Sequence, residues 1–144
     1  MVGADFNRER SEVEAPAVFV GQAVHAPELG HDDFAGLDLR GKIAVMFGGA
    51  PGTFDDNQRA FHSSRREKLR NVAERGAVGA VFVNTVDDEA RSPWAHAVQQ
   101  ATRPAMRLRA PDGRGIDTWP QLRATATVSA AAADALFEGS DRNA

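Results

Sequence analysis

The chain has 144 residues, no cysteine, 42% hydrophobic and 26% charged residues, and a formal net charge of −3. This length suits one folded domain, which can bury enough apolar surface to fold without a disulfide or a metal. The acidic balance disfavours a sequence-independent nucleic-acid binder, and the absence of cysteine excludes a disulfide scaffold, a thiol nucleophile and a thiolate zinc site.

Two apolar strands are predicted near the start of the chain. Residues 1–14 are mostly polar and are interpreted as a tail or linker. Four apolar residues at 17–20 are followed directly by a glycine, which predicts a strand buried on both faces. A loop containing His, Pro, Gly and Asp is expected at 22–37. A second buried strand is expected at 41–47, and it runs into a glycine-rich turn at 48–52.

A helix is predicted next, with Ser64 as its first cap. Ser64 and Glu67 form an S-x-x-E pattern, in which each side chain can satisfy the backbone N–H of the other. The apolar face of this helix consists of residues spaced i, i+3, i+4 and i+7, namely Leu69, Val72, Ala73 and Gly76. Gly76 is expected to take the left-handed conformation in which helices commonly end.

The same helix carries a basic surface. Its cations are Arg65, Arg66, Lys68, Arg70 and Arg75. We interpret them as a solvated face, on which Arg70 pairs with Glu74 at i, i+4. The alternative is a docking face for an acidic partner or for the catalytic domain of a host protein.

A third buried strand is predicted directly after this helix, at 78–83, because helix, glycine and β-branched strand is the order expected of an α/β unit. Residues 87–102 are polar and mixed, with a helical turn expected near Trp94. A fourth strand is expected at 104–108.

The last predicted strand lies at 123–128, where apolar and polar residues alternate with the period of a half-exposed strand. Ser129 is then expected to cap a short helix at 130–137 that Gly139 ends. Residues 140–144 are interpreted as a frayed tail.

A metal site would have to be built on the four histidines and the carboxylates, and none of the histidines lies in a zinc-ligand pattern such as H-E-x-x-H. Asp32 and Asp33, beside His31, could hold a hard cation through their carboxylates. We favour a hydrogen-bonded loop at this point, and we predict no metal and no cofactor in this chain.

A catalytic serine is also weighed, because Ser63 and Ser64 lie near His62 and the Asp55-Asp56 pair in the sequence. A triad needs an exposed serine with a base and an oriented acid in space, and sequence neighbours do not supply that arrangement. Ser64 has a sufficient role as helix cap. The glycines at 48–52 lack the order of a phosphate-binding loop and are read as a turn, so no catalytic residue is predicted.

The order of these segments resembles the protease-associated (PA) domains, in particular those inserted in the di-zinc aminopeptidases of metallopeptidase family 28. The opening of such domains is similar to 17–21, 25–27 and 32–45, and the most specific piece is D-D-F-A-G-L-D before Gly41-Lys42. The helix and strand at 66–83 and the end at 127–137 are similar too. Gln22-Ala23 departs from the family, in which an aromatic residue and a glycine are expected.

The resemblance implies a mixed α/β fold, a swivelling β/β/α domain over 15–139 with a small β-barrel-like sheet arrangement, flanking helices and tails at 1–14 and 140–144. It implies a non-catalytic accessory domain of an exported, periplasmic or extracellular, aminopeptidase. Zinc is then expected in the parent's catalytic domain, and the partners are that domain and the peptide substrate. We expect no nucleic-acid partner and, since no run approaches the ~20 apolar residues that span a bilayer, no membrane partner. Any export signal is expected outside this piece.

In such a parent, the domain would border the active-site cleft and control substrate access or protein interaction. The loops at 22–37 and 48–61 are our candidates for the contact rim. Its candidate residues are His25, His31, Asp33, Phe54, Phe61 and Trp94.

Two alternatives stay open. The chain could be the protein-binding PA module of another host, such as a subtilisin-like protease or a sorting receptor. It could also be a free-standing small α/β enzyme.

Overall fold

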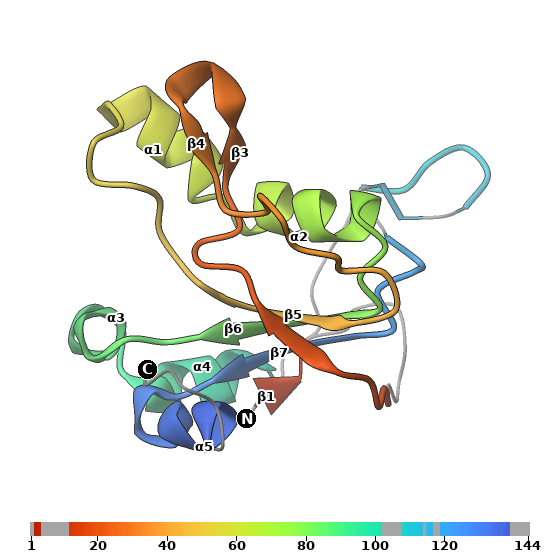
Figure 1. Cartoon of the computed structure of the whole chain (residues 1–144). Helices are drawn as coiled ribbons and strands as arrows, with labels where there is room; N and C mark the ends of the chain where they lie inside the picture. The colour runs from red at the N-terminus through yellow and green to blue at the C-terminus, as the bar shows by residue number, and fades with distance from the viewer. Residues whose placement is uncertain (1, 4–11, 102–107, 114, 117–118, 139–144) are drawn as a thin grey trace.

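An open five-stranded sheet is the centre of the fold (Figure 1). The computed structural model describes residues 2–3, 12–101, 108–113, 115–116 and 119–138. The strand order is β1-β7-β6-β5-β2. The parallel strands are β2 (Ala17–Phe19), β5 (Ile43–Phe47), β6 (Gly79–Val83) and β7 (Ala124–Val128), and β1 (Val2–Gly3), which falls within the predicted tail, pairs antiparallel with β7.

Helices lie on both faces of this sheet (Figure 1). One face is covered by α2 (Arg65–Glu74), and the other carries α4 (Trp94–Ala101) and α5 (Asp134–Phe137). The remaining elements between β6 and α5 are α3 (Val86–Arg91) and the 3-10 turn η2 (Ala130–Ala132). The predicted mixed α/β class is therefore confirmed, while the sheet of the described residues is open rather than closed into a barrel.

The alternation of side chains along the central strands builds two cores. Ala44, Met46 and Phe82 face α2, where they pack in one cluster with Val72 and Ala73. On the other face of the sheet, a second cluster joins Val45, Val83 and Ala133. The strands predicted at 17–20, 41–47, 78–83 and 123–128 are confirmed to within two residues at their ends. The strand predicted at 104–108 lies, except for Leu108, outside the described residues.

A second, smaller layer projects from the α2 side of the sheet (Figure 1). It contains a hairpin of β3 (His25–Ala26), the 3-10 turn η1 (Pro27–Leu29) and β4 (His31–Asp32), together with α1 (Asp56–His62). Val24, Ala26 and Phe54 form its own small core. We call residues 25–32 and 54–62 the protrusion. The sequence interpretation was wrong here, because 22–37 is not a plain loop and α1 was not predicted.

The ends of α2 show one correct and one wrong prediction. Ser64 stands at the N-cap position, but its side chain makes no capping hydrogen bond, so the predicted capping box is absent. Glu67 instead pairs with Arg70, which replaces the predicted Arg70–Glu74 pair. Gly76 follows the last turn with φ of +81° and is left-handed as predicted.

The short helix after β7 also differs from expectation. Ser129 occupies the N-cap position of η2, but its side chain makes no capping hydrogen bond. The predicted continuous helix at 130–137 is divided into η2 and α5. Among the described residues, no helix is both long and apolar enough to cross a membrane.

Substitution of Gly76 by alanine is expected to lower the free energy of unfolding by about 1–2 kcal/mol. The backbone at Gly76 has φ of +81°, and an added Cβ would lie 3.0 Å from Cγ of Arg40. Urea denaturation followed by circular dichroism measures the effect. The control is Gly52→Ala, because a Cβ at Gly52 meets no atom within 4 Å. Equal stabilities of the two variants would contradict the expected strain.

Candidate interaction surface

Five of the six predicted rim residues gather at the protrusion. His25 and His31 come from the hairpin, Asp33 follows β4 directly, and Phe54 and Phe61 belong to the segment around α1. The sixth, Trp94, is at the start of α4 on the opposite face of the sheet (Figure 1). The protrusion is therefore the candidate interaction surface, and Trp94 is not part of it.

Histidine–carboxylate contacts fix the hairpin. His25 Nδ1 lies 3.1 Å from Asp32 Oδ1 across the two strands, and His31 Nε2 lies 3.1 Å from Asp33 Oδ1. Asp32 also accepts the Phe34 N–H at 2.9 Å. Burial acts to raise the pKa of Asp32, but the Phe34 N–H and His25 together bring it below its ordinary value. These carboxylates thus have structural partners, and among the described residues no three His, Asp or Glu side chains converge on a metal position.

Aromatic rings line the contact between the hairpin and α1. His31 meets Phe54 edge-on at 5.7 Å between ring centroids, and Phe54 meets His62 at 5.4 Å. His62 also meets Phe61 at 4.9 Å, and 55% of Phe61 is exposed. His62 itself is buried, and its Nδ1 has no hydrogen-bond partner. The protrusion therefore presents one large exposed aromatic ring on a packed aromatic base.

A buried polar network joins the protrusion to the sheet layer. Lys68 Nζ donates to the carbonyl oxygens of Gln22 and Gly49, the latter at 2.6 Å. Asp33 Oδ2 accepts the backbone N–H groups of Gln22 at 3.1 Å and Val24 at 3.0 Å. We call Gln22, Asp33, Gly49 and Lys68 the Lys68 network. It holds the loops on either side of the protrusion against α2.

Burial of Lys68 corrects the predicted solvated face of the helix. Lys68 is 1% exposed, and Asn71 one turn later is also buried and donates to the Ala23 carbonyl at 3.1 Å. Burial lowers the pKa of Lys68 to about 8, although the nearby Asp33 carboxylate acts to raise it. Lys68, Asn71, Val72 and Arg75 have the same i, i+3, i+4, i+7 spacing as the face that was predicted. The spacing alone thus could not distinguish the two faces.

The alternative serine triad is not assembled. The Asp55 carboxylate accepts the Gln58 N–H at 2.9 Å and caps α1. His62 packs among aromatic rings, and the Ser63 hydroxyl donates to the Ala60 carbonyl at 3.4 Å. Each side chain has a structural place in or near α1, and none aligns with the others for proton transfer.

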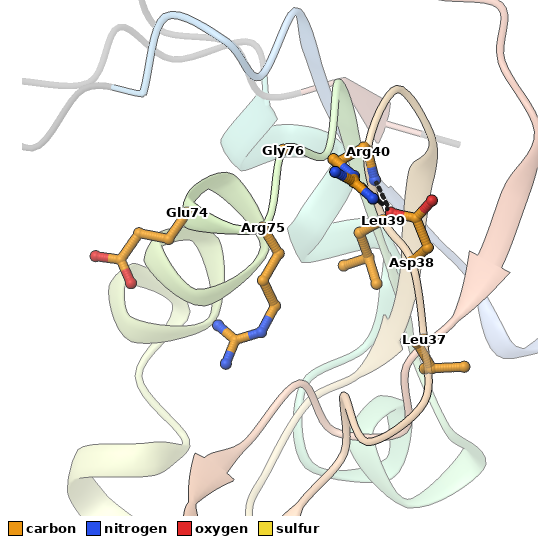
Figure 2. Close-up of a pocket in the computed structure, with 7 residues that line it drawn as sticks. All are labelled: Leu37, Asp38, Leu39, Arg40, Glu74, Arg75 and Gly76. Atoms are coloured by element: carbon orange, nitrogen blue, oxygen red, sulfur yellow. Dashed lines mark hydrogen bonds and ion pairs between the residues drawn. The ribbon is translucent and has the colours of Figure 1, made fainter.

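A hollow of about 450 Å³ lies where the end of α2 meets the loop before β5 (Figure 2). Asp38 accepts hydrogen bonds from the backbone N–H of Arg40 at 3.2 Å and from its Nε at 3.1 Å. The Arg75 guanidinium lies 4.1 Å above the Phe34 ring and donates to the Asn71 carbonyl at 2.9 Å. The lining of the hollow contains two carboxylates, Asp38 and Glu74, and two guanidinium groups, Arg40 and Arg75, so it carries no net charge to attract a charged ligand.

Comparison with known proteins gives one match. A family model for the PA domain matches residues 13–136. No curated protein and no solved structure matches the chain.

Proposed function

The chain belongs to the PA domain family, a class of protease-associated accessory modules, and we propose that its host is an exported zinc aminopeptidase of metallopeptidase family 28. The similarity of 32–45 and 66–83 to the PA domains of these enzymes supports this host. We assign no catalytic residue to the chain. Zinc and the general base belong to the parent's catalytic domain, in the periplasm or outside the cell.

The proposed role is to shape the approach to the active site rather than to take part in the reaction. The observation that supports it is the exposed Phe61 on a protrusion that the Lys68 network holds in place. The protrusion borders the active-site cleft of the parent and contacts the peptide chain as it enters. Phe61 offers apolar contact area, and it packs against His62, which in turn packs against Phe54. The Lys68 network keeps this surface in place, so that binding does not have to order it.

The coding sequence on either side of this chain tests the host. We expect it to encode a signal peptide and a domain whose His, Asp and Glu residues have zinc-ligand spacing. A serine-protease triad would overturn the aminopeptidase host and favour a subtilisin-like protease. A membrane span followed by a RING-type Cys/His pattern would favour a sorting receptor. Stop codons on both sides would show that the chain acts alone.

Kinetics of the parent enzyme test the rim. Phe61→Ala is expected to lower kcat/KM about 3- to 10-fold on a peptide of about ten residues, because one aromatic contact contributes on the order of 1 kcal/mol. An aminoacyl nitroanilide is too short to reach the rim, and its kcat/KM is expected to stay unchanged.

The matched control is Val86→Ala in α3, where the residue is 77% exposed and lies away from the protrusion. Its kcat/KM should equal that of the wild type on both substrates. An equal loss on both substrates for Phe61→Ala would indicate a general structural defect. No loss on the long peptide would refute contact by the rim.

A further inference from the structure

A second pocket lies at the edge of the sheet where three parallel strands end. Its volume is about 370 Å³, at the small end of the range for ligand pockets. Gly48 follows β5, Val83 ends β6 and Asn84 follows it, and Thr127 is the penultimate residue of β7. The opposite wall is formed by Arg65 and by side chains between Asp88 and Ala97. In open α/β sheets, ligands bind outside the carboxyl ends of the strands, and this pocket has that position.

Arg65 is the residue of this pocket best placed to bind an anionic ligand. Its guanidinium lies 3.9 Å above the Phe82 ring, and its Nη1 donates to Thr127 Oγ1 at 3.4 Å. Arg65 is exposed, and partial desolvation by the protein atoms near it lowers its pKa to about 10. It therefore remains a cation at neutral pH. Among the described residues, no carboxylate forms an ion pair with Arg65.

The other charges of the pocket neutralise each other. Asp88 accepts hydrogen bonds from Thr85 N at 3.0 Å, from Thr85 Oγ1 at 2.8 Å and from Arg91 Nη2 at 2.7 Å. The pocket lining thus contains the two cations Arg65 and Arg91 and the single anion Asp88, which leaves one positive charge. That charge is on Arg65, whose guanidinium contacts the Phe82 ring and the Thr127 hydroxyl.

We propose that this pocket binds a carboxylate of a peptide, with the Arg65 guanidinium as its ion-pairing partner. A planar guanidinium matches a carboxylate with two parallel N–H···O bonds. One uncompensated positive charge balances a monoanion, whereas a phosphate dianion would also meet the Asp88 carboxylate in the same lining. The carboxylate has two sources, the C-terminus of a peptide or an acidic side chain within it. The pocket shares no residue with the protrusion, so this binding is independent of the proposed rim.

Titration of the ¹⁵N-labelled chain with short acetylated peptides, followed by NMR, tests the proposal. The probes are Ac-Ala-Ala-Ala with a free carboxylate, its C-terminal amide, and Ac-Ala-Asp-Ala amide. We expect the amide signals of Asn84, Ala97 and Thr127 to shift with at least one carboxylate peptide, with Kd of about 0.1–1 mM. The neutral amide should cause no shift. The peptide that binds more tightly identifies the source of the carboxylate.

Arg65→Gln is expected to weaken this binding at least about 10-fold, since the charged pair is lost. Arg65→Lys keeps the charge without the planar fork and should give an intermediate affinity. The matched control is Arg123→Gln, an exposed arginine outside the pocket, which should bind as the wild type does. Equal binding of the neutral amide, an unchanged affinity of Arg65→Gln, or tighter binding of inorganic phosphate than of both carboxylates would overturn the proposal. Absence of shifts with every peptide would overturn it as well.

Discussion

Replacement of Lys68 by methionine is expected to lower the free energy of unfolding by about 2 kcal/mol at pH 7. Methionine keeps most of the side-chain length but removes the donors to the Gln22 and Gly49 carbonyl oxygens. Both loops then lose the group that ties them to α2, and Asp33 loses a nearby cation. The loss is partly offset because the buried charge no longer has to be desolvated. Urea denaturation of the purified chain measures the change.

The matched control is Lys42→Met, at the only other lysine of the chain. Lys42 is half-buried and stands just before β5, outside the Lys68 network. Its substitution should change the free energy of unfolding by no more than about 0.5 kcal/mol. If Lys68→Met were as stable as the wild type or more stable, the desolvation of the ammonium group would outweigh its hydrogen bonds, and the network would not stabilise the protrusion.

The stability that Lys68 contributes is expected to rise with pH between about 8 and 10.5. Burial lowers its pKa in the folded protein to about 8, from 10.5 in the unfolded chain. Between these values, the unfolded chain binds more protons at this site than the folded protein does. Raising the pH therefore favours folding. The full effect across this window is about 3 kcal/mol, and it is absent below pH 8, where both states are protonated.

The difference in free energy of unfolding between the wild type and Lys68→Met measures this effect, because other titrations cancel. The chain contains no tyrosine and no cysteine, so few other groups titrate in this range. We expect the difference to widen steadily from pH 8 to pH 10.5. If this difference stayed constant with pH, the pKa of Lys68 would be the same in the folded and the unfolded chain. The two carbonyl hydrogen bonds and Asp33 would then compensate fully for the loss of water around the ammonium group.

The strands of the central sheet could be predicted because their information is local. Residues 43–47 and 80–83 are continuous apolar runs, and each is bounded by glycine or by polar residues. Gly76 could be predicted for the same reason, since a glycine at the end of a helix commonly takes the left-handed conformation. Short elements were less predictable. The hairpin at 25–32 depends on the His25–Asp32 contact and on packing with Phe54, neither of which a local pattern shows.

The sequence does contain a capping pattern for helix α1. Asp55 and Gln58 form the D-x-x-Q version of a capping box, and the structure shows both of its hydrogen bonds. In contrast, the S-x-x-E pattern at Ser64 and Glu67 predicts a capping box that the structure does not contain. Glu67 is buried and pairs with Arg70 one turn later in the same helix, so its carboxylate is engaged there rather than at the backbone of Ser64.

The candidate sites depend on contacts between distant parts of the chain. The prediction placed Trp94 with the other rim residues because it lies in a loop-like segment, but β6 and β7 are connected across the opposite face of the sheet. The pocket around Arg65 was not predicted at all. Its ring and hydroxyl contacts come from Phe82 and Thr127, and the latter is 62 residues away.

The position of the two ends of the fold has a mechanical consequence. Val2 pairs with Thr127 in β7, and the last described helix, α5, follows β7 after the short turn η2 (Figure 1). A longer polypeptide that contained this domain would therefore be attached to it through neighbouring points on one side of the sheet. In such a polypeptide, two adjacent attachment points would leave the domain free to rotate about them as one body. The protrusion is on the far side of the sheet from α4 and α5, so such a rotation would displace it further than the parts of the domain near the attachment points (Figure 1).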